Sequence, residues 1–183
     1  SFLKLRNSFI KSNKEAKLSS YSSLSKIYTS MHLVDVQTKR YHIVKMTDQV
    51  LECLGKDFKK MGEYEIRDDF CGHINDIAEK TCIESQLQES LEFIDISTLE
   101  ERLLGENSIT HEFIDKISGW CRSRFIPVDY DENGRLLHVL FCIECIEEEK
   151  KRENRLIYLA RTDLMTGLCN RGSGEKRITE LLK

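Results

Sequence analysis

The sequence predicts an α+β protein in which an antiparallel sheet is flanked by helices. Two regions rich in strand-forming side chains, 27–45 and 109–146, enclose a middle region, 47–104, whose apolar residues recur at helical spacing. A further helix-forming segment follows at 147–162. Strands grouped before and after the helices favour antiparallel pairing, because parallel strands need a crossover between each consecutive pair.

The N-terminal segment, residues 1–25, predicts an amphipathic helix. Phe2, Leu5 and Phe9 recur at helical spacing, and basic residues lie between them. The polar stretch 18–23 indicates a joint after this helix. A monomer would leave the apolar stripe in water, so we expect a parallel homodimer held by this helix.

The first strand region predicts a β-hairpin. Residues 27–36 and 40–45 are rich in strand formers and are separated by the polar turn 37–39. In the helical middle region the apolar clusters are Val50, Leu51 and Leu54, then Ile74, Ile77 and Ala78, then Leu87, Leu91 and Ile94. A last helical turn is expected over 97–104, because Ser97-Thr98-Leu99-Glu100 resembles a helix-start box.

The second strand region predicts three strands, 109–114, 119–128 and 136–146. Asn133-Gly134 is a hairpin signal between the last two. Two strands, a helical middle and three antiparallel strands is the element order of a PAS domain, which residues 26–146 resemble. That resemblance implies a sensory domain whose pocket, between sheet and helices, takes a small molecule.

The segment 147–162 predicts one continuous linker helix. It contains no Gly or Pro, and its acidic residues precede its basic ones, which suits the helix dipole and i,i+4 pairing. Ile146, Glu153, Leu156 and Ala160 lie near coiled-coil spacing, so a short coiled coil is expected.

The most specific motif lies at residues 163–171, with the sequence Asp-Leu-Met-Thr-Gly-Leu-Cys-Asn-Arg. It resembles the D-x-L-T-G-L-x-N-R signature that opens GGDEF domains, with Met165 in place of Leu. Upstream, residues 145–147 occupy the place of the D-I-T tripeptide that ends many PAS domains. Glu153 and Leu156 fall where the connecting helix of the family carries E-x-x-L. The resemblance to the GGDEF family covers residues 163–183.

This resemblance implies a parent diguanylate cyclase that condenses two GTP molecules with Mg²⁺. The sequence contains no G-G-[DE]-E-F turn and no P-loop, so we expect this chain to be a catalytically inactive fragment without a cofactor or metal site. The chain would end just after the GGDEF domain begins. Asp163, Thr166, Asn170 and Arg171 would form the domain joint, with Asp163 and Arg171 pairing across its turn.

The candidate ligand-binding residues are Trp120, Arg122 and Arg124, which share one face of a predicted strand. An Arg pair beside an aromatic ring could hold a carboxylate ligand, although ion pairs with acidic residues of neighbouring strands are the favoured interpretation. Residues 120–125 lack the N-C-R-F-L-Q helix of photoactive flavin domains. Haem would need an inward histidine, and the five histidines, at 32, 42, 73, 111 and 138, are expected to be surface or packing residues.

The composition indicates which cellular compartment and which kinds of binding partner to expect. The net charge of −3 and pI near 6.0 give no sign of nucleic-acid binding, and no apolar run of about 18 residues could span a bilayer. Seven cysteines, an odd number, favour reduced thiols in a cytoplasm over a disulfide framework. Cys142 and Cys145 are expected on opposite faces of one strand, where they cannot share a metal.

Together these observations favour a bacterial, cytoplasmic, PAS-like sensory and dimerisation module that regulates cyclic-di-GMP synthesis by an attached GGDEF domain. Two alternatives stay open. The first is a structural dimerisation spacer that holds no ligand. The second is a regulator of a degenerate GGDEF domain that binds nucleotide without turnover.

Overall fold

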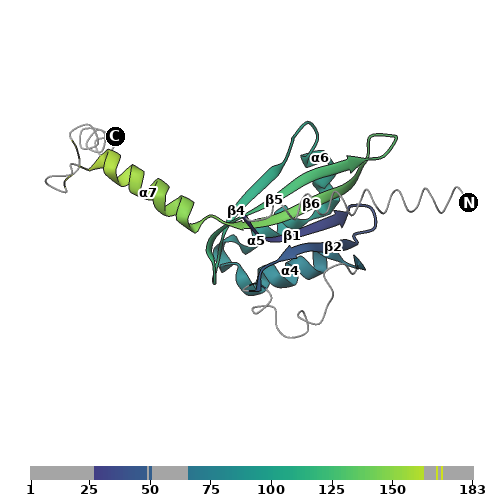
Figure 1. Cartoon of the computed structure of the whole chain (residues 1–183), viewed down its shortest axis with the longest axis horizontal. Helices are drawn as coiled ribbons and strands as arrows, with labels where there is room; N and C mark the ends of the chain where they lie inside the picture. Colours follow the sequence, from purple (N-terminus) through teal and green to yellow (C-terminus); the bar gives the residue numbers. More distant parts are fainter. Residues whose placement is uncertain (1–26, 49, 51–65, 163–167, 169, 171–183) are drawn as a thin grey trace, which may run out of the picture. The chain divides into compact units, whose positions relative to one another are not determined.

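Figure 1 shows a computed structural model of the chain, which describes residues 27–48, 50, 66–162, 168 and 170. The chain divides into two compact units, residues 1–145 and 146–183, and each is described by itself. The predicted N-terminal helix over 1–25 lies outside the described residues. So do Leu51 and Leu54 of the first predicted helical cluster.

The first unit is built on a six-stranded sheet in which every neighbouring pair of strands is antiparallel. The strand order is β3-β2-β1-β6-β5-β4, so the first hairpin and the last three strands join through β1 and β6. The prediction of an α+β fold with an antiparallel sheet flanked by helices is therefore confirmed. The strands are β1 Tyr28–Asp35, β2 Tyr41–Met46, β3 Ile66–Arg67, β4 Ile109–Asp115, β5 Gly119–Tyr130 and β6 Leu136–Cys145.

The predicted first hairpin is confirmed. Asp35, at the end of β1, fixes its turn because one carboxylate oxygen accepts the backbone N–H groups of Gln37 and Thr38 at 3.0 and 2.9 Å. Lys39 adopts a positive φ of 59°, which reverses the chain into β2.

The prediction that 47–104 is helical throughout is wrong at residues 66–67. These two residues form β3, in which Arg67 pairs with Tyr41 and Ile66 with His42 of β2. A strand of two residues is too short to show an alternating pattern, and it forms here because the edge of β2 leaves backbone groups to be paired. The α4 helix begins directly afterwards, and its N-cap Asp69 accepts the N–H of Gly72 at 3.0 Å.

Helices α4 (Phe70–Thr81), α5 (Glu84–Ile94) and α6 (Leu99–Arg102) follow, with the short 3₁₀ helix η2 (Ile96–Thr98) before α6. The helical turn predicted over 97–104 contains α6, but the predicted start box at Ser97 is wrong, because the N-cap of α6 is Thr98, which makes no side-chain capping bond. The side-chain cap is at Asp95, which precedes η2: its carboxylate accepts the backbone N–H of Ser97 at 2.9 Å and its hydroxyl at 2.8 Å. These hydrogen bonds lower the pKa of Asp95.

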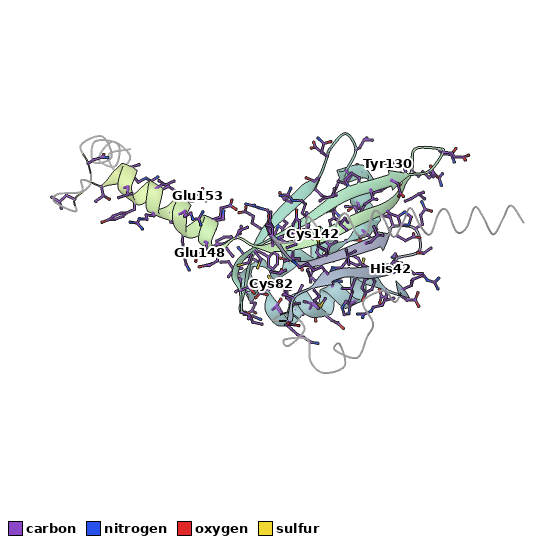
Figure 2. The ribbon with its side chains drawn as sticks, viewed as in Figure 1. His42, Cys82, Tyr130, Cys142, Glu148 and Glu153 are labelled. Carbon is purple, nitrogen blue, oxygen red and sulfur yellow. The ribbon has the colours of Figure 1, made fainter. Side chains whose placement is uncertain are left out.

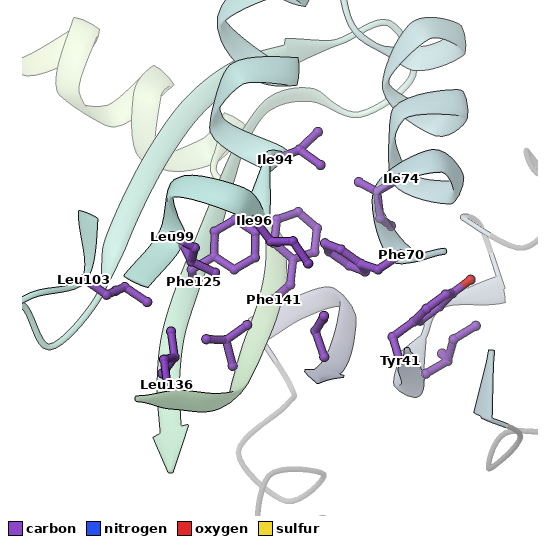
Figure 3. Close-up of a cluster of buried hydrophobic side chains, with 13 residues drawn as sticks. Tyr41, Phe70, Ile74, Ile94, Ile96, Leu99, Leu103, Phe125, Leu136 and Phe141 are labelled. Atoms are coloured by element: carbon purple, nitrogen blue, oxygen red, sulfur yellow. The ribbon is translucent and has the colours of Figure 1, made fainter. Parts of the chain in front are cut away.

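The main core lies between the helices and one face of the sheet, which we call the inner face. Phe125 of β5, Phe141 of β6 and Phe70 of α4 meet there and are almost fully buried (Figure 3). Burying side chains of this size stabilises the fold by about 1.5–3 kcal/mol each. The opposite, outer face carries a second buried cluster formed by Met31, Leu33, Leu140 and Cys142.

The last two strands form the predicted hairpin, closed by a longer turn than two residues. Asp131 accepts the backbone N–H groups of Asn133 and Arg135, both at 2.8 Å, and Gly134 has a φ of 79°. A positive φ of this size suits glycine, which has no Cβ to clash.

The second unit contains α7, Glu147–Arg161, which confirms the predicted linker helix. Acidic residues occupy its first turn, and Lys151 lies 3.0 Å from Glu148 and 3.6 Å from Glu147. Figure 2 shows the charged side chains of this helix, with Glu148 and Glu153 labelled. The N-cap residue Ile146 makes no side-chain capping bond, so acidic side chains and the helix dipole stabilise this end.

Candidate functional site

His32 of β1 is the most unusual polar residue of the inner face. Its side chain is 1% exposed, and its ring lies 5.9 Å from that of Tyr41, 6.3 Å from Phe70 and 6.1 Å from Phe141, measured between centroids. Among the described residues, neither ring nitrogen has a hydrogen-bond partner. A buried polar group without a partner is costly, so such a group is a candidate for function.

The surroundings of His32 keep its ring neutral. Burial lowers the pKa of His32 to about 3, and the nearby positive groups His73 and Arg67 act in the same direction. Burial likewise lowers the pKa of His73 and raises that of Tyr41. An uncharged imidazole keeps one donor and one acceptor nitrogen, which is the form that binds neutral ligands or metals.

Tyr41, Arg67 and His73 complete a polar cluster around His32. The rings of Tyr41 and His73 stack at 5.6 Å, and the Arg67 guanidinium donates a hydrogen bond to the Tyr41 oxygen. The four residues come from β1, β2, β3 and α4, so the short strand β3 is what brings the guanidinium to this place. This donor-rich group, which we call the His32 cluster, could orient a small polar or anionic ligand.

Aromatic rings fill the inner face beside the cluster. Phe141 lies 5.4 Å from Phe70 and 4.8 Å from Phe125 (Figure 3). Phe93 lies 5.4 Å from Phe125. These are ordinary packing distances for aromatic pairs. A ligand at the His32 cluster would therefore replace side-chain packing rather than enter open space.

A second polar chain crosses from α5 to β4. The Ser90 hydroxyl lies 3.1 Å from Nε2 of His111 and 3.6 Å from Sγ of Cys82. Burial lowers the pKa of His111, whose ring stacks between Phe93 and Phe113. Ser90 and Cys82 are 4% and 1% exposed, so this chain secures the helices to the sheet and offers no accessible nucleophile.

The predicted ligand residues Trp120, Arg122 and Arg124 all lie on β5, at alternate positions of one strand. Arg122 donates to Glu112 of β4 at 2.7 Å and to Glu144 of β6 at 3.1 Å. Arg124 lies 3.8 Å from the same Glu144 oxygen. The guanidinium of Arg122 thus joins three strands through neighbouring carboxylates, which is the arrangement favoured above, and ligand binding by this trio stays a prediction.

The two cysteines of the C-x-x-C pair lie on opposite faces of β6, as predicted for residues three apart on a strand. Cys142, labelled in Figure 2, is fully buried on the outer face, whereas Cys145 is exposed at the end of β6. Among the described residues, no group of three or more His, Cys, Asp or Glu side chains could hold a metal ion.

Only Asn170 of the predicted domain joint lies among the described residues, because Asp163, Thr166 and Arg171 fall outside them. Its backbone N–H donates to the carbonyl of Arg161 at 2.8 Å, and its side-chain amide donates to the carbonyl of Ala160. These are final carbonyls of α7, which have no partner within a helix. Asn170 therefore caps the C-terminus of α7.

Sequence reasoning placed all five histidines as surface or packing residues and missed the isolation of His32. His138 fits the expectation, since its Nδ1 lies 2.7 Å from an oxygen of Asp129. His32 differs because it is buried without such a partner. The available signal was its position between two apolar residues, Met31 and Leu33, in a strand that is buried on both faces.

No family model matches this chain, and no curated protein matches it. Solved structures resemble it at low identity. One is a sensory box histidine kinase/response regulator from Burkholderia thailandensis E264, with 13% identity and a TM-score of 0.39, over 69% of this chain and 83% of that one. Another is a histidine kinase domain from Haloarcula marismortui named for light and redox sensing, with 11% identity and a TM-score of 0.40, over 70% and 97%.

Within the part of the chain that the structure describes, none of the helices has the length and apolar character that crossing a bilayer requires.

Proposed function

We propose that this chain is a cytoplasmic sensory and dimerisation module that regulates cyclic-di-GMP synthesis by an attached GGDEF domain. The observation that carries the proposal is the block 163–171, which matches the opening signature of that family at six of seven fixed positions. It follows α7 after a single residue, Thr162, and α7 itself begins two residues after β6 ends.

The linker helix supports this proposal because it is continuous. Its 15 residues, Glu147–Arg161, contain no Gly or Pro and span about 22 Å at 1.5 Å per residue. Asn170 of the signature caps its final carbonyls. A rotation or tilt at Glu147 would therefore reach the signature through a rigid element.

The apolar side chains of α7 support dimerisation. Leu156 is 67% exposed and Tyr158 58%, while Ile157 and Leu159 are also exposed. A second, parallel copy of the helix would cover Leu156, which lies at the predicted coiled-coil spacing, and cyclases of this kind need two GTP-loaded domains facing each other. The geometry of the dimer would then set the output.

The His32 cluster is the region of this chain that we propose to bind the sensed molecule. It combines a neutral, buried imidazole with a guanidinium and a phenol, which together suit a small polar or anionic ligand. GTP and Mg²⁺ would be bound by the attached domain and not by these residues.

The full-length parent protein tests the proposal directly. It should convert GTP and Mg²⁺ into cyclic-di-GMP, and Leu156→Glu in α7 should change the rate at least several-fold, because it places a charge in the dimer seam. Leu104→Glu is the matched control, since Leu104 is 84% exposed in the first unit and should leave the rate unchanged. A parent that makes no cyclic-di-GMP, or equal rates in all three proteins, would refute the proposal.

The packed aromatic interior favours one alternative, a dimerisation spacer that holds no ligand. Native mass spectrometry of the purified chain distinguishes the two functions. A co-purified mass that is lost in Arg67→Ala supports the sensory role, and a bare chain with unchanged cyclase control supports the spacer.

A further inference from the structure

Two cysteines face each other across the β5–β6 hairpin. In the antiparallel register, Cys121 of β5 is the direct partner of Cys145 of β6. Directly opposite residues in such a pair have Cα atoms about 4.5 or 5.5 Å apart, according to whether they exchange hydrogen bonds. Both separations fall within the range that a disulfide spans, about 4.4–6.8 Å.

The two side chains also share one face. They lie at even spacing from Phe125 and Phe141, which pack together on the inner face, and no register shift interrupts this part of the ladder. The pair therefore has the register and the face that a cross-strand bond requires.

The two thiols differ in access to solvent. Cys121 is 3% exposed, whereas Cys145 is an exposed residue whose Sγ donates to the Ser118 carbonyl at 3.3 Å. An exposed thiol beside a buried one is the arrangement in which the first meets the oxidant and the second resolves the product.

We propose that Cys121 and Cys145 form a reversible, redox-responsive disulfide site whose oxidant is a peroxide. The Cys145 thiolate attacks one oxygen of hydrogen peroxide, which breaks the O–O bond, gives a sulfenic acid and releases water after protonation. The Cys121 thiolate then attacks the sulfenic sulfur and displaces the hydroxyl group as a second water molecule. One peroxide is reduced, and two thiols are oxidised to one disulfide.

Two other described cysteines are poor partners for this chemistry. Cys142 lies on the outer face, and burial raises its pKa to about 12, so it stays a protonated thiol. Cys82 lies outside the named strands, in an isolated bridge with Asp115, and it contacts the Ser90 hydroxyl at 3.6 Å. Selectivity for the cross-strand pair thus follows from strand register, because Cys121 is the residue directly opposite Cys145.

The geometry also predicts that the bond is easily reduced. Opposite Cβ atoms in a regular antiparallel pair are about 4.5–5.5 Å apart, whereas a disulfide brings them to about 3.8 Å. The strands must therefore approach locally, and the strain raises the reduction potential of the bond. A strained bond of this kind cycles with the thiol pool instead of serving as a permanent staple.

The cysteine pair lies at the end of β6 that precedes the linker helix α7 in the sequence. Cys145 is the last residue of β6, and α7 begins at Glu147. Oxidation would tie the end of β6 covalently to β5, directly before the linker helix. The assignment rests on strand register and thiol access alone, and it stands whether or not the chain controls a cyclase.

Peptide mapping of the intact chain after treatment with hydrogen peroxide tests the proposal. Reduced and oxidised samples are alkylated, digested and analysed by mass spectrometry. We expect a peptide that links Cys121 to Cys145 in most molecules, a mass loss of two hydrogen atoms, and reversal by reduced glutathione. Cys142→Ser is the matched control and should form the same link.

The single variants separate the two roles. Cys121→Ser should leave a sulfenic acid on Cys145 that dimedone traps, and Cys145→Ser should abolish both the link and the trapping. A link from Cys145 to Cys142 or to another chain would overturn the proposal. So would over-oxidation of Cys145 while Cys121 stays reduced in the wild-type protein. Because the wild-type map decides the question, a variant that fails to fold does not prevent the test.

Discussion

At the scale of single residues, His32 is a functional candidate that the sequence pattern did not reveal, because its strand is buried on both faces of the sheet. The five residues Met31–Asp35 include four that are buried, since helices cover the inner face and a second cluster occupies the outer face. If only one face of this strand were buried, the apolar Met31 and Leu33 would be expected on it, and alternation would then place His32 in water. Its isolation could not be predicted from the sequence, because that depends on the rings that surround it.

The first prediction concerns the dependence of stability on pH. The pKa of His32 is about 3 when folded and near 6.5 when unfolded, so below pH 6.5 the unfolded chain binds a proton that the folded chain does not. Stability should fall by roughly 1 kcal/mol for each pH unit between pH 6.5 and pH 5. His32→Phe should make this slope shallower in urea unfolding experiments.

Burial lowers the pKa values of His73 and His111 too. These two residues therefore keep part of the dependence of stability on pH in the His32→Phe variant. Arg67 and Tyr41 also lie near His32, and burial raises the pKa of Tyr41, so its phenol stays protonated over this pH range. An identical slope in wild type and His32→Phe would show that His32 is already protonated in the folded protein.

For Arg122, the strand face and the kind of partner predicted from the sequence both agree with the structure. Strand alternation predicted its shared face with Arg124, and ion pairs to neighbouring strands were the favoured interpretation. Which acidic residues would pair could not be predicted, because Glu112 and Glu144 become neighbours only once the β4–β5 and β5–β6 registers are set. Register is a property of the hairpin turns, outside the strand itself.

The second prediction follows from the burial of that ion cluster. The side chains of Arg122 and Glu144 are 18% and 11% exposed, so Arg122→Met leaves a carboxylate largely out of water. We expect a loss of about 2 kcal/mol in the free energy of unfolding, and Glu144→Gln in the same chain should restore part of it.

Arg40→Met is the matched control for this measurement. The ion pair of Arg40 with Asp68 has a similar length, 2.8 Å, but its side chains are 58% and 79% exposed. Solvent screening leaves such a pair worth less than about 1 kcal/mol. Equal losses from the two Arg→Met changes would mean that burial contributes nothing to the Arg122 cluster.

At the scale of elements, long and strongly patterned segments were predictable and short ones were not. The strands β1, β2, β4, β5 and β6 and the helix α7 match their predictions because each carries a sustained pattern of apolar residues or helix formers. The two-residue strand β3 has no pattern of its own, and pairing with β2 creates it. The cap at Asp95 was missed because Ser97-Thr98-Leu99-Glu100 offered a local alternative that the tertiary structure does not use.

The third prediction concerns the β5–β6 turn. Gly134 has a φ of 79°, and a Cβ added there would meet no atom within 4 Å, so any cost of substitution comes from the backbone. Gly134→Ala should therefore destabilise the protein by about 1–2 kcal/mol. Gly134→Asn should cost less, because asparagine tolerates the left-handed region. Thermal unfolding of both variants checks this, and equal losses would contradict the backbone argument.

At the scale of the whole molecule, we propose that the sheet with its buried polar cluster acts through the continuous helix α7 on a domain that the GGDEF-like segment 163–171 would open. The sequence was sufficient for the fold class, because that depends on patterns within contiguous segments, and the resemblance of residues 163–171 to the GGDEF signature stays a prediction. The sequence was insufficient for the His32 cluster and for the cysteine pair, which form only when separate strands come into register. The proposed control of cyclase output depends on α7 acting as a rigid coupling.

Insertions in α7 of the full-length parent protein test that central claim most directly, with cyclic-di-GMP production from GTP and Mg²⁺ as the measured quantity. Four residues inserted between Arg152 and Glu153 rotate the downstream part by about 40°, since each residue turns the helix by about 100°. Seven residues rotate it by about −20°, which is nearly in phase. We predict that four residues change production strongly and that seven largely restore it. Equal production in the wild type and both insertion variants would contradict the account, because α7 would then be a passive tether.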